Sequence, residues 1–230
     1  MQCDGLNVIR VDNFFSTDEC KALLHSLSPS LPLVDPRASS RRQRLQTDIM
    51  EQPLIDCIWS RLSAARSLSP DTEQLLGNLA VDDDGDGLDG QWSASHLRPR
   101  LLFAGYGPTD FYGHHFDLRV TEDGRTLMDM GIEKDKMARK SASLVSHATA
   151  VVYLNENGRD FVGGCTNILK PPPDPPHIIE SIALTTGSAL LFLQEQVYHE
   201  GGAVHSGNKF ILRADVLYRR LNSAGSTEKP

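Results

Sequence analysis

The sequence has no long hydrophobic run and no excess of positive charge. None of its apolar stretches approaches the roughly 18 residues that a membrane-spanning helix needs. The start, MQCDGLNVIRVDNFF, carries Asp4 and Asn7 where a signal peptide would be basic and then apolar. Thirty acidic side chains against 23 basic ones give a formal charge of −7, which disfavours a general binder of nucleic acids or anionic membranes. We therefore expect a soluble protein with neither kind of partner.

Cysteine is also scarce and scattered. The four cysteines, Cys3, Cys20, Cys57 and Cys165, include no CxxC pair, which argues against a compact zinc site and against a disulfide scaffold. The simplest interpretation is a reducing compartment, the cytoplasm, with the nucleus as an alternative. The remaining composition, 40% hydrophobic and 23% charged, is typical of one globular domain of this length.

Residues 1–95 are predicted to supply a strand and supporting helices to that single domain. The apolar run Leu6–Val11 indicates a strand. Ser16, followed by Glu19 three residues later, has the form of a helix capping box, which predicts a helix over Thr17–Ser26.

Three further segments complete this part of the chain. The basic segment Arg37–Arg44 is interpreted as a solvated loop. Apolar residues from Ile49 to Leu62 recur at mixed three- and four-residue spacings, which predicts a second helix packed on the core. The acidic segment VDDDGDGLDG, Val81–Gly90, fails as a calcium loop because Ser93 stands where the closing glutamate belongs, and its aspartates argue against a phosphate loop. A flexible acidic surface loop is the better interpretation.

Residues 96–220 show the pattern of an all-β core. Short apolar runs alternate with turns, which is compatible with a sandwich or a jelly roll. The proline-rich segment Lys170–Pro176 predicts an extended connection, and Leu221–Pro230 a disordered tail. The predicted strands are Leu101–Ala104, Ala148–Leu154, Ile178–Leu184, Ala189–Leu193 and Phe210–Leu217.

The motif His115-Phe116-Asp117 can supply two ligands to one metal ion. In a β-strand successive side chains alternate between faces, so His115 and Asp117 would share a face. Two histidines and one carboxylate with open positions are typical of non-haem Fe(II) oxygenases, so a second histidine from a distant strand is required. His199, just after the apolar run Ala189–Leu193, suits that position.

Lys209 follows His199 by ten residues and opens another predicted strand. A turn between them would place its ammonium beside the metal, where it could pair with the distal carboxylate of a bound dicarboxylic acid. Arg213 would share the strand face of Lys209 and could help to bind an anion, although a salt bridge with a neighbouring carboxylate is the more common role.

Several ordered motifs between Trp92 and Arg220 together resemble the prolyl 4-hydroxylase-type Fe(II)/2-oxoglutarate-dependent dioxygenases. The family pattern has a tyrosine nine residues before the first metal ligand, which selects His115 over His114. The matching segments are Tyr106-Gly107-Pro108, His115-Phe116-Asp117, Tyr153-Leu154-Asn155, Gly163-Gly164-Cys165-Thr166, Gly187 to Phe192 and His199 to Tyr218.

The resemblance implies a mainly β (α+β) fold, a double-stranded β-helix or jelly-roll core with supporting N-terminal helices. It also implies that Fe(II), 2-oxoglutarate and O2 are used, with succinate and CO2 as products and ascorbate as a candidate reductant. The implied iron ligands are His115, Asp117 and His199. Lys209 would bind the C5 carboxylate of 2-oxoglutarate, and Tyr106 and Thr166 would line the cosubstrate pocket.

The substrate remains open between three functions. The resemblance favours hydroxylation of a protein side chain, with proline as the first candidate. A small-molecule hydroxylase is the alternative, and a non-catalytic jelly-roll module that keeps a metal is the third. Gly105 and Thr109 depart from common family residues beside the cleft, which bears on specificity. A zinc protease is excluded, because Ala203 stands where the second histidine of HExxH belongs.

Overall fold

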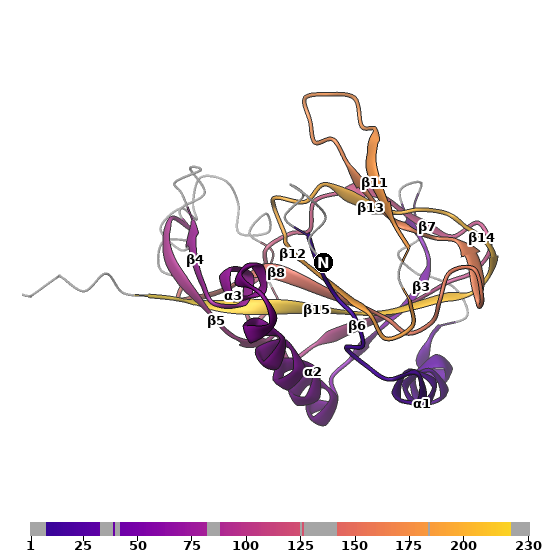
Figure 1. The fold of residues 1–230 in the computed structure, drawn as a ribbon, viewed down its shortest axis with the longest axis horizontal. Helices are drawn as coiled ribbons and strands as arrows, with labels where there is room; N and C mark the ends of the chain where they lie inside the picture. Colours follow the sequence, from indigo (N-terminus) through magenta and orange to yellow (C-terminus); the bar gives the residue numbers. More distant parts are fainter. Residues whose placement is uncertain are drawn as a thin grey trace, which may run out of the picture.

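The computed structural model describes residues 8–32, 39, 42–81, 88–124, 126, 142–183 and 185–221. They form two main antiparallel sheets, with helices lying against one of them (Figure 1). The mainly β class predicted from the sequence is confirmed. The helices are α1 (Thr17–Leu27), α2 (Gln52–Ala65) and α3 (Pro70–Leu76), with 3-10 turns at Ser28–Ser30 and Arg66–Leu68.

The major sheet contains eight strands among the described residues. Its order is β1-β12-β8-β15-β5-β4, and β6 pairs with the first half of β15 and carries β3 on its other edge. The strands are β1 (Val8–Val11), β3 (Leu45–Ile49), β4 (Asn78–Val81), β5 (Gly90–Leu97), β6 (Leu101–Tyr106), β8 (Leu144–Tyr153), β12 (Ala189–Leu193) and β15 (Lys209–Arg220).

The minor sheet faces the major sheet from the side opposite to α1 and α2 (Figure 1). Its order is β11-β10-β13-β7-β2, and a separate ribbon joins β14 to β9. These strands are β2 (Arg42–Gln43), β7 (Phe111–His115), β9 (Phe161–Gly163), β10 (Thr166–Leu169), β11 (Ile178–Ile182), β13 (His199–Gly201) and β14 (Val204–Gly207).

Strand β15 divides its side chains between two environments. Leu212 lies opposite Val152 of β8 and belongs to the main hydrophobic cluster, whereas Ile211, opposite Tyr153, belongs to a second cluster on the other face. This alternation follows from the two-residue period of a strand. We call the face toward α1 and α2 the outer face and the face toward the minor sheet the inner face.

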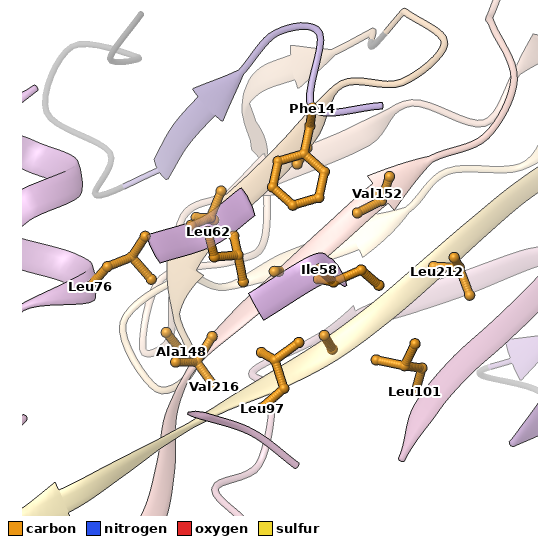
Figure 2. Packing of buried hydrophobic residues seen from close by; sticks show 14 of the residues in the cluster. Phe14, Ile58, Leu62, Leu76, Leu97, Leu101, Ala148, Val152, Leu212 and Val216 are labelled. Atoms are coloured by element: carbon orange, nitrogen blue, oxygen red, sulfur yellow. The ribbon is translucent and has the colours of Figure 1, made fainter. Parts of the chain in front are cut away.

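The outer face carries the hydrophobic core. Helix α2 packs Ile58 and Leu62 into the cluster that contains Val152 of β8 and Leu212 of β15, and in Figure 2 Ile58 lies between Leu62 and Leu212. All four are essentially inaccessible to water. Burial of each such side chain contributes about 1.5–3 kcal/mol relative to exposure, so this face supplies much of the stability of the fold.

Helix α1 begins as the sequence predicts and is tied to α2. The Ser16 hydroxyl accepts the backbone N–H of Glu19 at 3.2 Å, and the Glu19 carboxylate accepts the backbone N–H of Ser16 at 2.8 Å. The capping-box prediction is therefore confirmed. Arg61 of α2 donates to the same carboxylate at 2.5 Å and to the Phe14 carbonyl, so one ion pair joins the two helices.

Two sequence predictions for the N-terminal part were wrong in detail. Ile49 ends strand β3 rather than opening a helix, because α2 begins at Gln52 with Pro53 in its first turn. Arg44 is 6% exposed and does not lie in a solvated loop, since β2 and β3 bring this segment against β7 and β6.

Other predictions fall on residues that the structure does not describe. These include Cys3, half of the segment Arg37–Arg44, residues 82–87 of the acidic segment and 222–230 of the predicted tail. The three described cysteines are free. Within the described chain, every helix is too short or too polar to cross a membrane.

Candidate functional site

A small cavity of about 40 Å³ lies between the inner face of the major sheet and the minor sheet. Strands β6, β7, β13 and β15 all contribute to its wall. The structure brings all seven candidate site residues of the sequence analysis to this one cavity: Tyr106, His115, Asp117, Thr166, His199, Lys209 and Arg213.

Three of these residues can hold a metal ion. One donor atom from each of His115, Asp117 and His199 lies within 4.8 Å of the others, and the described residues contain no other such group. The two histidines are direct partners across the β7–β13 pair, with ring centroids 4.4 Å apart. Sheet pairing thus joins two segments that are 84 positions apart in the sequence.

Asp117 reaches this group by a route that strand alternation did not predict. Strand β7 ends at His115, so Asp117 is not on the same strand. The backbone after the strand still brings its Oδ1 to 3.3 Å from Nε2 of His115. Asp117 thus lies beside His115 as predicted, but the predicted cause, alternation of side chains along one strand, is wrong.

Backbone carbonyls orient both imidazoles. Nδ1 of His115 bonds the Gly113 carbonyl at 2.8 Å, and Nδ1 of His199 bonds the Val197 carbonyl at 3.0 Å. Because a carbonyl oxygen only accepts, each Nδ1 carries the proton and each Nε2 keeps its lone pair. This arrangement is typical of metal-binding histidines, whose second nitrogen is held by an outer partner.

Asp117 is kept ionised in a buried position. Burial opposes its charge, but the positive charge of Arg213, with smaller effects of His115 and His199, outweighs it and holds the pKa of the carboxyl well below its usual range. The Thr149 hydroxyl donates to Oδ2 at 2.7 Å, and Arg213 lies 3.4 Å from the same atom. Burial lowers the pKa of His199, which favours the neutral form that a metal requires.

The donor set therefore fits a first-row divalent metal ion. Two neutral imidazoles and one carboxylate gathered on one side of a cavity leave further coordination positions open, as in the two-histidine, one-carboxylate sites of non-haem Fe(II) oxygenases. Hydrogen bonds with outer groups hold each of the three side chains.

Lys209 is buried at the same cavity with no carboxylate partner among the described residues. Its ammonium donates to the Gly164 carbonyl at 2.6 Å and lies 5.3 Å from the ring centres of Tyr106 and Tyr153. Burial lowers the pKa of Lys209 to about 8, against a smaller opposing effect of Cys165 and with a contribution from the charge of Arg44. A buried cation of this kind is costly unless an anion joins it.

The Gly163-Gly164 turn holds the partner carbonyl of Lys209. Both glycines have positive φ, 83° and 62°, which favours glycine over other residues. A Cβ on Gly164 would come within 3.2 Å of the Lys209 side chain. The two glycines therefore let the backbone approach the amine closely.

Tyr153 and Arg44 line the cavity but were not predicted as site residues from the sequence. The hydroxyl of Tyr153 bonds that of Thr166, and burial raises the pKa of Tyr153. The Arg44 guanidinium donates to the Tyr106 hydroxyl at 2.5 Å and lies over the Tyr112 ring at 4.4 Å. The Tyr153-Leu154-Asn155 motif was a signal for the first residue, but no local signal marks Arg44 within its basic segment.

Arg213 and His114 behave as the sequence suggested. Arg213 pairs with Asp215 at 2.9 Å, the salt bridge named as its more common role, and still lines the cavity. His114 is exposed and lies outside the three-residue metal group. The ring of His114 rests 5.5 Å from that of Tyr198.

Comparison with solved structures identifies the fold. The viral collagen prolyl hydroxylase of Paramecium bursaria Chlorella virus-1 is similar over 95% of this chain and 99% of its own, with a TM-score of 0.55 and 20% identity. A Trichoplax adhaerens prolyl hydroxylase, solved with a peptide fragment of the hypoxia-inducible factor oxygen degradation domain, covers 94% of this chain and 85% of its own (TM-score 0.53, 15% identity).

The same fold also occurs in an enzyme with different chemistry. SnoN, a non-haem alpha-ketoglutarate-dependent epimerase of nogalamycin biosynthesis, is similar over 98% of this chain and 88% of its own, with a TM-score of 0.53 and 13% identity. No family model matches the sequence, and neither does any curated protein sequence. The chain has the jelly-roll fold of the 2-oxoglutarate Fe(II) oxygenases, so the predicted fold class is confirmed.

Proposed function

We propose that this protein is an Fe(II)- and 2-oxoglutarate-dependent dioxygenase. The observation that carries the proposal is one cavity containing both a His115-Asp117-His199 donor group and a buried Lys209 that has no carboxylate partner among the described residues. A structural metal site would need the three ligands but not a buried cation beside them. That cation favours an enzyme over the non-catalytic metal-binding module.

The residues of the chain have distinct tasks in this proposal. His115, Asp117 and His199 hold the ion, and bound Fe(II) with 2-oxoglutarate and O2 supplies the oxidising chemistry, leaving succinate and CO2. Lys209 exchanges its bond to the Gly164 carbonyl for one to the C5 carboxylate of 2-oxoglutarate. The hydroxyls of Tyr106 and Thr166 line that end of the pocket.

Surrounding groups keep these residues in place. The carbonyls of Gly113 and Val197 fix the rings, and Thr149 fixes the Asp117 carboxylate, so little reorganisation is needed when the ion binds. Ascorbate is a candidate reductant for iron. Arg213 steadies Asp117 and is a weaker candidate for cosubstrate contact.

A protein side chain, with proline as first candidate, is the substrate proposed from the family resemblance. Two neighbours in fold are prolyl hydroxylases, one of them solved with a peptide fragment. A small-molecule substrate is the second candidate, since the fold also serves an epimerase of nogalamycin biosynthesis. A proline-rich peptide that stimulates succinate release would favour the first candidate.

Anaerobic addition of Fe(II) and then 2-oxoglutarate tests the proposal through the visible metal-to-ligand charge-transfer band. The band should appear in the wild type and be lost in His199→Ala. His114→Ala is the matched control, because it removes the neighbouring exposed histidine of the H-H-F-D segment, and it should keep the band. Lys209→Ala should need more 2-oxoglutarate. A folded wild type without the band would overturn the proposal.

Two further predictions accompany this function. We propose that residues 1–95 belong to one domain with the 96–220 core, because β1, β3 and β5 each pair with a strand of that core. A cytoplasmic location remains a prediction, supported by the free state of the three described cysteines.

A further inference from the structure

A second cavity adjoins the candidate metal centre, and arginines dominate its wall. Its volume is about 250 Å³, and it shares Arg44, Tyr112 and Arg213 with the cavity of the metal centre. We call it the arginine cavity. Its charged lining residues are Arg44, Arg98, Arg100, Arg213, Asp48 and Asp215.

The arginine cavity has an excess of positive charge in an acidic chain. Four guanidinium groups face two carboxylates, whereas the whole sequence carries a formal charge of −7. Low-dielectric walls concentrate such a local field and raise the local concentration of ligands of opposite sign. The imbalance therefore favours an anionic occupant.

Both carboxylates of the wall are already paired. Asp48 accepts a hydrogen bond from Arg100, and Asp215 lies between Arg213 at 2.9 Å and Arg98 at 3.7 Å. Arg213 also lies 3.4 Å from the Asp117 carboxylate of the adjoining cavity, so the charge of Arg44 is the one that remains to be neutralised by another group.

Arg44 and Arg213 retain capacity to bind that group. Arg44 donates to Gln46 and Tyr106 and has no carboxylate partner within the described part of the chain. The Nε of Arg213 is buried and has no hydrogen-bond partner among the same residues. Guanidinium groups of this kind are suited to carboxylate and phosphate oxygens.

Three neighbouring strands build this wall. In the register of the major sheet, Asp48 of β3 lies opposite Leu102 of β6, which lies opposite Arg213 of β15. All three therefore face inward side by side. The cavity is thus part of the sheet framework, next to the Asp117 carboxylate that Arg213 contacts.

We propose that the arginine cavity binds an oxyanion of the substrate, a carboxylate or a phosphate, and that the substrate is a small organic acid, which favours the second substrate candidate, a small molecule, over a protein side chain. The proposal rests on the proposed function, because the cavity would hold the substrate beside the metal centre. Lys209 serves the cosubstrate and lies outside the arginine cavity lining. The volume lies below the ~300–1,000 Å³ of drug-sized sites, so it suits a ligand of amino-acid size.

Calorimetric titration of the protein loaded with Mn(II) and saturating 2-oxoglutarate tests this proposal without turnover. The probes are N-acetyl-L-proline and benzoate, each beside its neutral amide, and phenyl phosphate. At least one oxyanion should bind about tenfold or more tightly than its neutral counterpart, with an affinity that falls as salt is added. The carboxylate and phosphate arms identify which oxyanion the cavity prefers.

Arg100→Gln removes one positive charge from the wall and should weaken oxyanion binding at least tenfold. Arg66→Gln is the matched control, because Arg66 also pairs with a carboxylate, that of Glu73 on α3, but lies outside the cavity. It should bind like the wild type. Denaturant unfolding of both variants confirms that each is folded.

Three results would overturn the inference. They are equal binding of acids and amides with no preference for phosphate, unchanged oxyanion binding in Arg100→Gln, and oxyanion binding that occurs only when 2-oxoglutarate is absent. A charge-transfer band without oxyanion binding would remove this inference alone. Oxyanion binding without the band would remove the dioxygenase proposal but keep the anion site.

Discussion

The two faces of the major sheet are made by the same strands and have opposite characters. On β15, Leu212 and Val216 face the helices and are almost inaccessible to water, whereas Lys209 and Arg213 face the minor sheet and carry charge. Hydrophobic burial thus stabilises the outer face, and polar groups held at some energetic cost line the inner face. Alternate residues of β15 therefore point either into the hydrophobic core under the helices or toward the candidate site.

The energetic cost of burying polar groups on the inner face is limited because hydrogen bonds satisfy most of them. Thr149 illustrates this, since its hydroxyl donates to Asp117 and accepts a hydrogen bond from Gln194. Gln194 in turn donates to Asp215. Such a network rigidifies a polar interior. Lys209 and Arg44, which have no carboxylate partner among the described residues, mark the places where anionic ligands are expected.

The largest expected effect is on the outer face. Leu212→Ala should lower the free energy of unfolding by about 2–5 kcal/mol, because it removes a buried side chain and leaves a cavity beside Val152. Urea denaturation gives this value. Leu102→Ala, the same change at a half-buried inner-face position, should cost clearly less. Equal losses at the two sites would contradict the division between the faces.

A smaller effect is expected for Thr149→Val on the inner face. The substitution keeps the shape but removes the hydroxyl that donates to Oδ2 of Asp117, so Mn(II) affinity should fall about 10- to 100-fold with little change in fold. Thr47→Val, the same change on the outer side of β3, serves as control and should leave metal affinity unaltered. Calorimetry that finds the same affinity in both variants would remove Thr149 from the metal centre.

The charge of Lys209 should make 2-oxoglutarate binding depend on pH. Its lowered pKa of about 8 means that the amine is charged at pH 7 and largely neutral at pH 9 in the ligand-free protein. Binding a dicarboxylate at pH 9 must then include uptake of a proton, so the dissociation constant should be about tenfold higher than at pH 7. Lys209→Arg stays charged and should show no such rise. Parallel pH curves for the two proteins would exclude Lys209 as the carboxylate partner.

The smallest expected effect concerns the ion pair between the helices that cover the outer face. A hydrogen bond from Arg61 lowers the pKa of Glu19 to about 2, from an ordinary value of 4.5. A carboxyl with a lowered pKa stabilises the folded state above its ordinary pKa, and this contribution is lost as the pH falls from about 4.5 toward 2. Glu19→Gln should therefore show a slightly flatter decline of stability in that range. A steeper decline would reverse the assigned sign.

Local sequence signals predicted the central elements well. The capping box at Ser16 and Glu19 specified where α1 begins, and the apolar runs located β8, β12 and β15. These strands are buried on at least one face, so hydrophobicity alone reveals them. The predicted bounds differ from the observed ones, because β8 begins at Leu144, before the polar pair Ser146-His147, and strand pairing extends β15 to Arg220.

Features that depend on pairing between strands far apart in the sequence could not be predicted from local signals. Strand β5 is half polar, and β2 and β13 are two and three residues long, so neither period nor composition marks them. Arg44 belongs to a basic segment that looks solvated, and the pairing of β2 with β7 and of β3 with β6 buries it. For the candidate site, motif order identified the residues, while their burial and charge balance required the three-dimensional structure.

Unfolding with and without ligand tests the account most directly. Mn(II) and 2-oxoglutarate should each be supplied at about 100 times their dissociation constants, where binding to one site stabilises the folded state by about 2.7 kcal/mol. The wild type and His114→Ala should be stabilised by at least this amount, and His199→Ala should lose most of the gain from both ligands. Equal stabilisation of His199→Ala, or none in the folded wild type, would contradict the assignment of the inner face as a metal and cosubstrate site.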